Sequence, residues 1–253
     1  MGWYELLWIG RLLLLMQLVH GWGKLGHYAV CKIAEGHLTE DATATVKQLL
    51  PDSAKGELAS VCSWPDHIKY YYNWQWTTSL HYVDTPNFKC NYKYIRDCYD
   101  SAGHKNNCVT GAILNYTKQL LTSYQRYNPM LKYNLTESLL FLAHYMADVH
   151  QVWDTMIIDT AVKTFYGSNL LIFPEIVDST AKAWKDRPLH VFPPLLPLNS
   201  SPTFVSFSFA VLNDYFLSRL PVVEKGLAQG GIRLASVLNR LFNFRVKMGR
   251  SSR

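Results

Sequence analysis

The stretch TESLLFLAHYMADVHQVWD, residues 136–154, joins an apolar run to two histidine–aspartate pairs, His144 with Asp148 and His150 with Asp154. The members of each pair are four residues apart, and residues at this spacing share one face of an α-helix. The apolar run predicts that the helix is buried, where a carboxylate is costly unless it is paired or bound to a metal. A single pair is more often a core histidine beside a surface acid, and two pairs in one apolar helix leave both explanations open, so the rest of the chain has to decide.

The composition is that of an ordinary globular protein enriched in tyrosine and tryptophan. Its 253 residues suffice for one large domain, and no linker or internal repeat divides them. A formal net charge of +6 and a pI near 9.0 fit either an anionic partner or a merely basic secreted protein. No segment alternates convincingly as a half-buried strand does, so we expect an all-α, mostly helical single domain.

Residues 1–21 have the features of a signal peptide. Residues 9–19 form a leucine-rich block too short to span a membrane, and Val19-His20-Gly21 suits signal-peptidase cleavage before Trp22. We therefore expect a secreted chain, extracellular or vacuolar, that starts at Trp22 and has no membrane contact in its mature form. Three sequons for N-glycosylation agree with secretion and begin at Asn115, Asn134 and Asn199.

The cysteines also fit an oxidising compartment, although their number is odd. An even number is expected where all cysteines are paired, so one of them lacks a partner. No CxxC spacing occurs, which argues against a zinc site built from cysteines. The five cysteines are Cys31, Cys62, Cys90, Cys98 and Cys108.

Periodicity and capping residues predict most of the helices. Thr39 is a candidate N-cap for a helix that stops at Pro51, and Asn134 with Glu137 forms a candidate capping box. The expected helices span residues 22–38, 39–50, 109–126, 136–151, 152–166 and 213–244, the last broken at Pro221 and at Gly230-Gly231.

Residues between these helices are assigned from local composition. Trp64-Pro65-Asp66 predicts a turn that opens a short helix, and residues 79–86 look extended or looped. The aromatic residues from Tyr70 to Trp76 are interpreted as core rather than as a ligand platform. Residues 87–108, rich in Cys, Asn and Tyr, are expected to form a cross-linked loop.

One segment, residues 187–212, does not fit a helical protein. It has no helical period and is rich in proline, phenylalanine and valine. We interpret it as atypical of the fold, with a buried strand over residues 204–212 as the alternative.

Four motifs in order resemble the secreted zinc-dependent single-strand nucleases of plants and fungi, also called bifunctional nucleases. They are Trp22 with His27, WPD at 64–66, LHYVDTP at 80–86 and LAHYMADVHQ at 142–151. The resemblance covers residues 22–186 and 213–242. It implies a disulfide-linked, all-α domain of the phospholipase C and single-strand nuclease type over residues 22–244, with a zinc cluster in a cleft and a basic tail at 245–253.

The resemblance also implies an activity and partners. The expected enzyme is a monomer that hydrolyses single-stranded DNA and RNA to 5′-phosphate products and also acts on 3′-nucleotides. The implied ligands of one zinc ion are Asp66, His81, His144 and the bridging carboxylate Asp148. Those of a second zinc ion are Asp148, His27, and the free amine and carbonyl oxygen of Trp22, an amine that exists only after cleavage.

Further residues receive roles from the same resemblance. Lys69 and Asp148 are the implied catalytic residues, with Lys69 stabilising charge on the phosphate. Tyr82 and Asp84 are implied to bind the base by stacking and hydrogen bonding. Stacking on an aromatic ring requires an accessible base, which fits a preference for single strands. Cys31 and Cys62 are the implied disulfide.

The chain departs from the family directly after Gln151. Family members continue with Pro-Leu-His and a loop carrying two histidine ligands of a third zinc ion, whereas here Val152-Trp153-Asp154 follows at once. We therefore expect two zinc ions rather than three. A helix continuous through the junction would turn His150 and Asp154 about 120° away from His144 and Asp148, leaving them weak candidate ligands.

Two alternatives to an active nuclease remain open. The chain could be an inactive zinc-binding relative or an unstable variant, because losing a metal that acts on developing charge costs several kcal/mol. A phospholipase C shares the N-terminal tryptophan and the zinc ligands, but Tyr82 and Asp84 argue against it.

Overall fold

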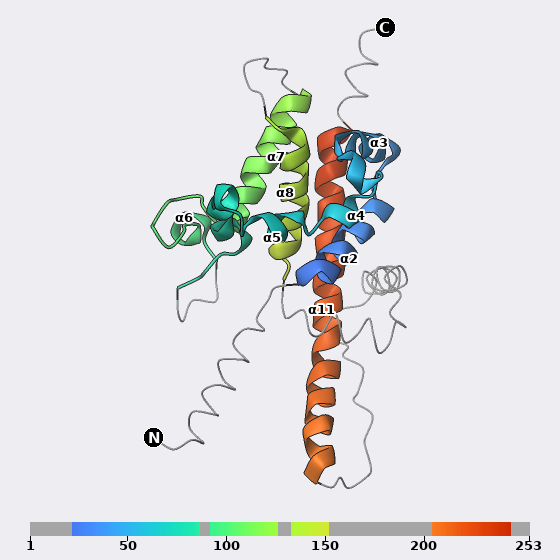
Figure 1. The fold of residues 1–253 in the computed structure, drawn as a ribbon, viewed down its shortest axis with the longest axis vertical. Coiled ribbons are helices and arrows are strands. Elements are labelled where there is room, and N and C mark those ends of the chain that lie inside the picture. Colours follow the sequence, from blue (N-terminus) through green and yellow to red (C-terminus); the bar gives the residue numbers. More distant parts are fainter. Residues whose placement is uncertain (1–21, 87–91, 126–132, 152–203, 244–253) are drawn as a thin grey trace.

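The computed structural model describes residues 22–86, 92–125, 133–151 and 204–243, which contain helices and no β-strand (Figure 1). The predicted all-α class is therefore confirmed. None of the helices in these ranges has the length and apolarity needed to cross a bilayer. Cys90, Asp154, Asn199, the expected helix at 152–166 and the tail at 245–253 lie outside the described residues.

Helix α8 (Leu135–Asp148) is the centre of the domain. Its N-terminus has the predicted capping box, because the Asn134 side chain accepts from the Glu137 amide at 3.2 Å and donates to the Glu137 carboxylate at 2.7 Å. Every residue from Ser138 to Ala147 is buried. A helix that is apolar on all sides must be surrounded by other elements.

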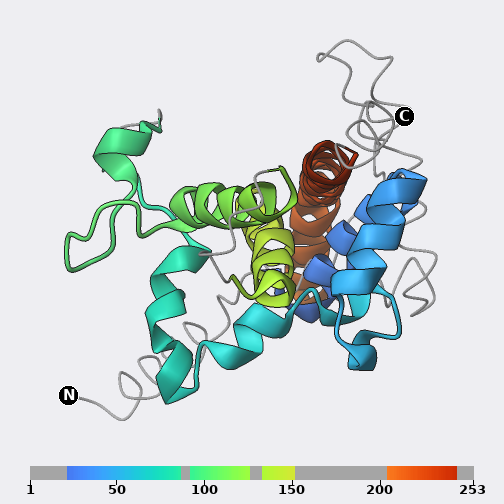
Figure 2. The same ribbon diagram turned by 90° about the horizontal axis from the view of Figure 1, so that it is seen from above.

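The neighbouring helices surround α8. Figure 2 shows α8 between α7 on one side and α2, α3 and α11 on the other, and α5 and η2 contact it as well. The bounds of these elements are α2 Gly23–Gly36, α3 Glu40–Leu49, η1 Asp52–Ala54, α4 Leu58–Val61, α5 Trp64–Ile68, η2 Tyr72–His81, α6 Tyr94–Asp97, α7 Val109–Gln125 and α11 Phe204–Phe242.

Most local predictions are confirmed. Thr39 caps α3 by accepting from the Ala42 amide, and Trp64-Pro65-Asp66 opens the short helix α5. The disulfide Cys31–Cys62 joins α2 to the C-cap of α4. A second disulfide, Cys98–Cys108, cross-links the loop that precedes α7. One expectation fails here, because residues 79–81 belong to the 3₁₀ segment η2 rather than to an extended loop.

Helix α11 contradicts the predicted breaks at Pro221 and Gly230-Gly231, because it is continuous from 204 to 242 and extends past the other helices (Figure 1). Residues 204–212 are therefore helical, and neither the strand alternative nor an aperiodic segment holds there. The glycines serve close packing: a Cβ on Gly231 would lie 2.5 Å from Ile33 Cγ2 on α2. Buried positions repeat along the same helix at Val223, Leu227, Leu234 and Leu238.

Helix α8 ends at Asp148, so the predicted helix continuous through residue 151 is wrong. The His150 amide bonds the Ala147 carbonyl at 3.0 Å, three residues back. The carbonyl that a continuing α-helix would offer to this amide belongs to Met146, and the His150 side chain occupies it at 2.7 Å. This side-chain bond stands in for the missing backbone bond and ends the helix.

Candidate metal centre

Five side chains from four elements converge near the C-terminal end of α8. Helix α2 supplies one histidine, α5 an aspartate, η2 a second histidine, and α8 a histidine and an aspartate. They are His27, Asp66, His81, His144 and Asp148, all named as candidate zinc ligands from the sequence.

Asp148 lies at the middle of this cluster. Its Oδ1 is 3.4 Å from His27 Nε2, while its Oδ2 is 3.0 Å from His81 Nδ1 and 3.2 Å from His144 Nε2. Oδ1 therefore faces one imidazole and Oδ2 faces the other two, as expected of a carboxylate that could bridge two metal ions.

Asp66 closes the cluster on the side of α5. Its Oδ2 is 3.4 Å from His27 Nε2, and its Oδ1 is 3.6 Å from His81 Nδ1 and 3.7 Å from His144 Nε2. The same Oδ1 accepts from Lys69 Nζ at 2.7 Å. Lys69, one turn after Asp66, is thus held at the edge of the cluster.

A backbone carbonyl orients His144. Its Nδ1 lies 2.8 Å from the carbonyl oxygen of Cys62, and because a carbonyl can only accept, Nδ1 carries a proton. Nε2 is then the atom directed at Asp148 and His81. Carbonyl contacts of this kind fix the tautomer of metal-binding histidines. Here the Cys31–Cys62 disulfide ties that carbonyl to α2.

Burial and the dense charges perturb the acid–base properties of the cluster. Burial, and then the neighbouring His144, lower the pKa of His27 to about 3. Burial would raise the pKa of Asp148, but its interactions with His144, His81 and His27 outweigh this and hold the pKa well below its usual range. Burial would lower the pKa of His144, yet the Asp148 and Asp66 carboxylates raise it overall.

The donor set fits a metal ion. Among the described residues, two groups have ligand atoms within 4.8 Å of one another: His27, Asp66 and His144, and His81, His144 and Asp148. Imidazole nitrogens and carboxylate oxygens are ligands that zinc accepts. A carboxylate ionised at the centre of buried imidazoles also supplies the charge that a divalent cation needs.

Comparison with known proteins identifies the family of the chain. The family profile "S1/P1 Nuclease" matches residues 22–151, and Endonuclease 5 of Arabidopsis thaliana is 45% identical over 96% of this chain and 98% of its own length. The chain belongs to the S1/P1 nuclease family. Endonuclease 4 of the same plant is 43% identical over 95% of this chain and 96% of its own length. Nuclease P1 of Penicillium citrinum is 33% identical over 51% of this chain and 46% of its own.

The lengths of these alignments bear on the predicted deletion. The match with Endonuclease 4 extends over 288 positions, whereas this S1/P1-type chain has 253 residues, so at least 35 aligned positions have no counterpart in it. This chain is therefore shorter than Endonuclease 4 within the aligned region.

Three other predicted site residues, Tyr82, Asp84 and Trp22, belong to neither ligand group. Tyr82 follows His81, exposes 46% of its surface, and is anchored by its carbonyl, which accepts from the Val109 amide at 3.0 Å. Asp84 is exposed. Trp22 is fully buried at the N-cap of α2. The part of its amine and carbonyl in metal binding stays a prediction.

His150 is not brought into either ligand group. Its Nε2 lies 2.5 Å from Arg233 Nη1 on α11, and since a guanidinium can only donate, Nε2 accepts and Nδ1 donates to Met146. Both nitrogens are thereby used within the protein. Arg233 is 83 residues away in sequence, so no local pattern could have revealed this contact.

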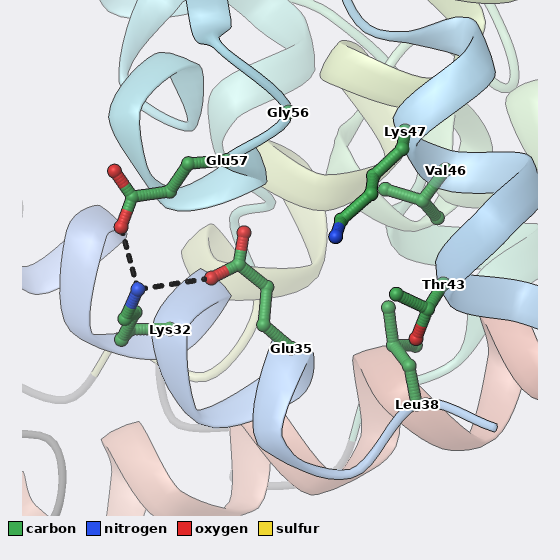
Figure 3. Close-up of a pocket in the computed structure, with 8 residues that line it drawn as sticks. All are labelled: Lys32, Glu35, Leu38, Thr43, Val46, Lys47, Gly56 and Glu57. Carbon is green, nitrogen blue, oxygen red and sulfur yellow. Dashed lines mark hydrogen bonds and ion pairs between the residues drawn. The ribbon is translucent and has the colours of Figure 1, made fainter. Parts of the chain in front are cut away.

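A surface hollow of about 300 Å³ lies elsewhere, between α2, α3 and the residues just before α4 (Figure 3). Lys32 crosses part of it to reach Glu57 at 2.5 Å and Glu35 at 3.4 Å. The hollow shares no residue with the histidine–aspartate cluster. Lys32, Glu35 and Glu57, three of the charged residues that line it, are thus paired with one another.

Proposed function

We propose that this chain is a secreted, zinc-dependent endonuclease that hydrolyses single-stranded DNA and RNA to 5′-phosphate products and also acts on 3′-nucleotides. The observation that carries the proposal is the buried convergence of three histidines and two aspartates in a member of the S1/P1 nuclease family. The net charge of +6 suits a polyanionic substrate. Residues 1–21 would direct the chain to the secretory pathway, and the domain would act as a monomer.

In this proposal the cluster holds two zinc ions. Asp66, His81 and His144 would bind one, His27 and the free amine and carbonyl of Trp22 would bind the other, and Asp148 would bridge them. When bound, zinc supplies Lewis acidity and an ionised water near neutral pH, and it neutralises charge on the phosphate.

The protein side chains position the substrate. Lys69, held against Asp66 at 2.7 Å, would neutralise charge that develops on the phosphate oxygens. Tyr82, exposed beside His81, would stack on a base, and Asp84 would accept a hydrogen bond from that base. A base paired within a duplex is not free to stack in this way, which supports a single-strand preference.

A second candidate function is an inactive zinc-binding relative. It is favoured by the aligned positions that the chain lacks and by the absence, after Gln151, of the Pro-Leu-His segment expected for a third zinc ion. Losing a metal that acts on developing charge would reduce the rate about a thousand-fold or more.

The deciding experiment measures zinc per chain on secreted, N-terminally sequenced protein and cleavage of single-stranded DNA on the same sample. Two zinc ions with cleavage, both lost in Asp148→Asn, would support the nuclease. Two zinc ions without cleavage would favour the inactive relative. No zinc in the folded chain would refute the ligand assignments.

A further inference from the structure

Three consecutive tyrosines next to the cluster are exposed, contrary to the prediction that this aromatic segment is core. Tyr70 exposes 69% of its surface, Tyr71 67% and Tyr72 88%. Single exposed aromatic rings are common, whereas a larger exposed apolar surface marks an interaction site. Of the neighbouring aromatics, Trp74 follows the prediction and packs against the core, whereas Trp76 is 56% exposed.

The backbone of this segment is held in place. The Tyr71 amide donates to the Ile68 carbonyl at 2.9 Å, and the Tyr71 carbonyl accepts from the Trp74 amide at 2.8 Å. Ile68 is buried, and Trp74 packs against Phe141 of α8 with ring centroids 5.8 Å apart. The tyrosines are therefore presented from an anchored turn, which lowers the entropy cost of binding a ligand.

Lys69 connects these rings to the cluster. Its Nζ is 2.7 Å from Asp66 Oδ1 and 5.7 Å from the centroid of the Tyr70 ring, within the range of a cation–π contact. A phosphate that reaches Lys69 would therefore place its neighbouring nucleotides within reach of the tyrosines.

We propose that Tyr70, Tyr71 and Tyr72 form a stacking platform for bases of a single strand that flank the cleaved nucleotide. This inference rests on the proposed function and adds a second aromatic subsite to the one at Tyr82. Rings with hydroxyl edges suit nucleobases, since every base has a face on which an aromatic ring can stack. The occupant is a polyanion, in keeping with the net charge of +6.

The test measures binding of a fluorescent phosphorothioate oligothymidylate to the zinc-loaded full chain by anisotropy, with the probe checked for integrity afterwards. Replacing both Tyr71 and Tyr72 by alanine should weaken binding at least about tenfold, because a stacked base is worth roughly five- to 150-fold per ring. Phenylalanine at both positions should restore binding, whereas leucine, apolar but without a ring, should not. Hydrolysis of thymidine 3′-phosphate, which has one base, should be unchanged.

Tyr133→Ala is the matched control. Tyr133 is 36% exposed and precedes the start of α8, about 20 Å along that helix from Asp148. Its removal should leave the dissociation constant unchanged. Because binding is measured separately from cleavage, a chain that cuts nothing yet binds through the tyrosines would refute the proposed nuclease activity while supporting the platform.

Three results would overturn the platform. One is an unchanged dissociation constant in the double alanine variant, and another is an equal loss in Tyr133→Ala. The third combines two observations. The leucine variant binds the oligonucleotide as well as the wild type does, and sedimentation shows a dimeric wild-type protein but a monomeric double alanine variant. Together they would assign the rings to a contact with a second copy of the chain.

Discussion

His144 and His150 lie six residues apart at the end of one helix, and each donates its Nδ1 proton to a backbone carbonyl. The difference lies at Nε2. His144 Nε2 faces the Asp148 carboxylate at 3.2 Å, whereas His150 Nε2 accepts from Arg233 at 2.5 Å. A metal cation needs a free lone pair near negative charge, so only His144 is in a suitable environment. The comparison predicts that the charge facing a histidine, rather than its spacing from an aspartate, decides whether it binds metal.

The largest expected effect is on His144. His144→Ala should remove bound zinc and, if the chain is an active nuclease, lower cleavage of single-stranded DNA at least about a thousand-fold. Zinc per chain and initial rates measure both. Retention of the wild-type zinc content would break the comparison, because His144 would then be no more a ligand than His150.

The Cys31–Cys62 disulfide should support His144 through the Cys62 carbonyl. Replacing both cysteines by alanine should lower the free energy of unfolding by about 3–4 kcal/mol, from the entropy of a loop of 31 residues, and should also weaken zinc binding. Denaturant unfolding and zinc titration measure the two effects.

Cys98→Ala with Cys108→Ala is the control, since this disulfide spans only 10 residues and does not touch the cluster ligands. It should cost about 1 kcal/mol less and leave zinc affinity unchanged. Equal losses of zinc affinity in both double variants would argue against a role for the Cys62 carbonyl.

A smaller effect is expected where α11, the helix that carries Arg233, packs on α2. Gly231→Ala would place a methyl group 2.5 Å from Ile33, so the unfolding free energy should fall by about 1–3 kcal/mol despite the better helix propensity of alanine. Gly36→Ala in α2 meets nothing within 4 Å and should be neutral or slightly stabilising. Equal stability of the two variants, compared by urea unfolding, would contradict the close helix contact.

The smallest effect is expected at His150. His150→Ala leaves the Met146 carbonyl and Arg233 without their partner and should cost about 1–2 kcal/mol of stability, while zinc per chain stays at the wild-type value. Thermal or urea unfolding and elemental analysis give both numbers. A drop in zinc content with the fold intact would make His150 a ligand after all.

The boundaries of most helices were predictable because their causes are local. Asn134 and Glu137 cap α8 within four residues of each other, and Thr39 does the same for α3. The predicted breaks in α11 were wrong because they rested on the local tendency of proline and glycine to interrupt a helix. At Gly231 the missing side chain serves a contact with Ile33, almost 200 positions earlier in the chain.

The candidate centre was likewise predictable only in part. Helix periodicity predicts the pairing of His144 with Asp148. For His27, Asp66 and His81 only the resemblance to a family predicts a place in the centre, because no local pattern connects them. The exposure of Tyr70, Tyr71 and Tyr72 was predicted wrongly. An aromatic run has the composition of a core, and only the turn after α5 directs these rings outward.

The sequence by itself determined the helical class, the caps and the burial of α8, since backbone hydrogen bonds and periodicity act over a few residues. Tertiary structure alone decided that Asp148 faces three imidazoles, that Arg233 donates a hydrogen bond to His150, and that three tyrosines stay exposed beside Lys69. The physical reason is that burial and charge at a side chain depend on which distant segments pack against it.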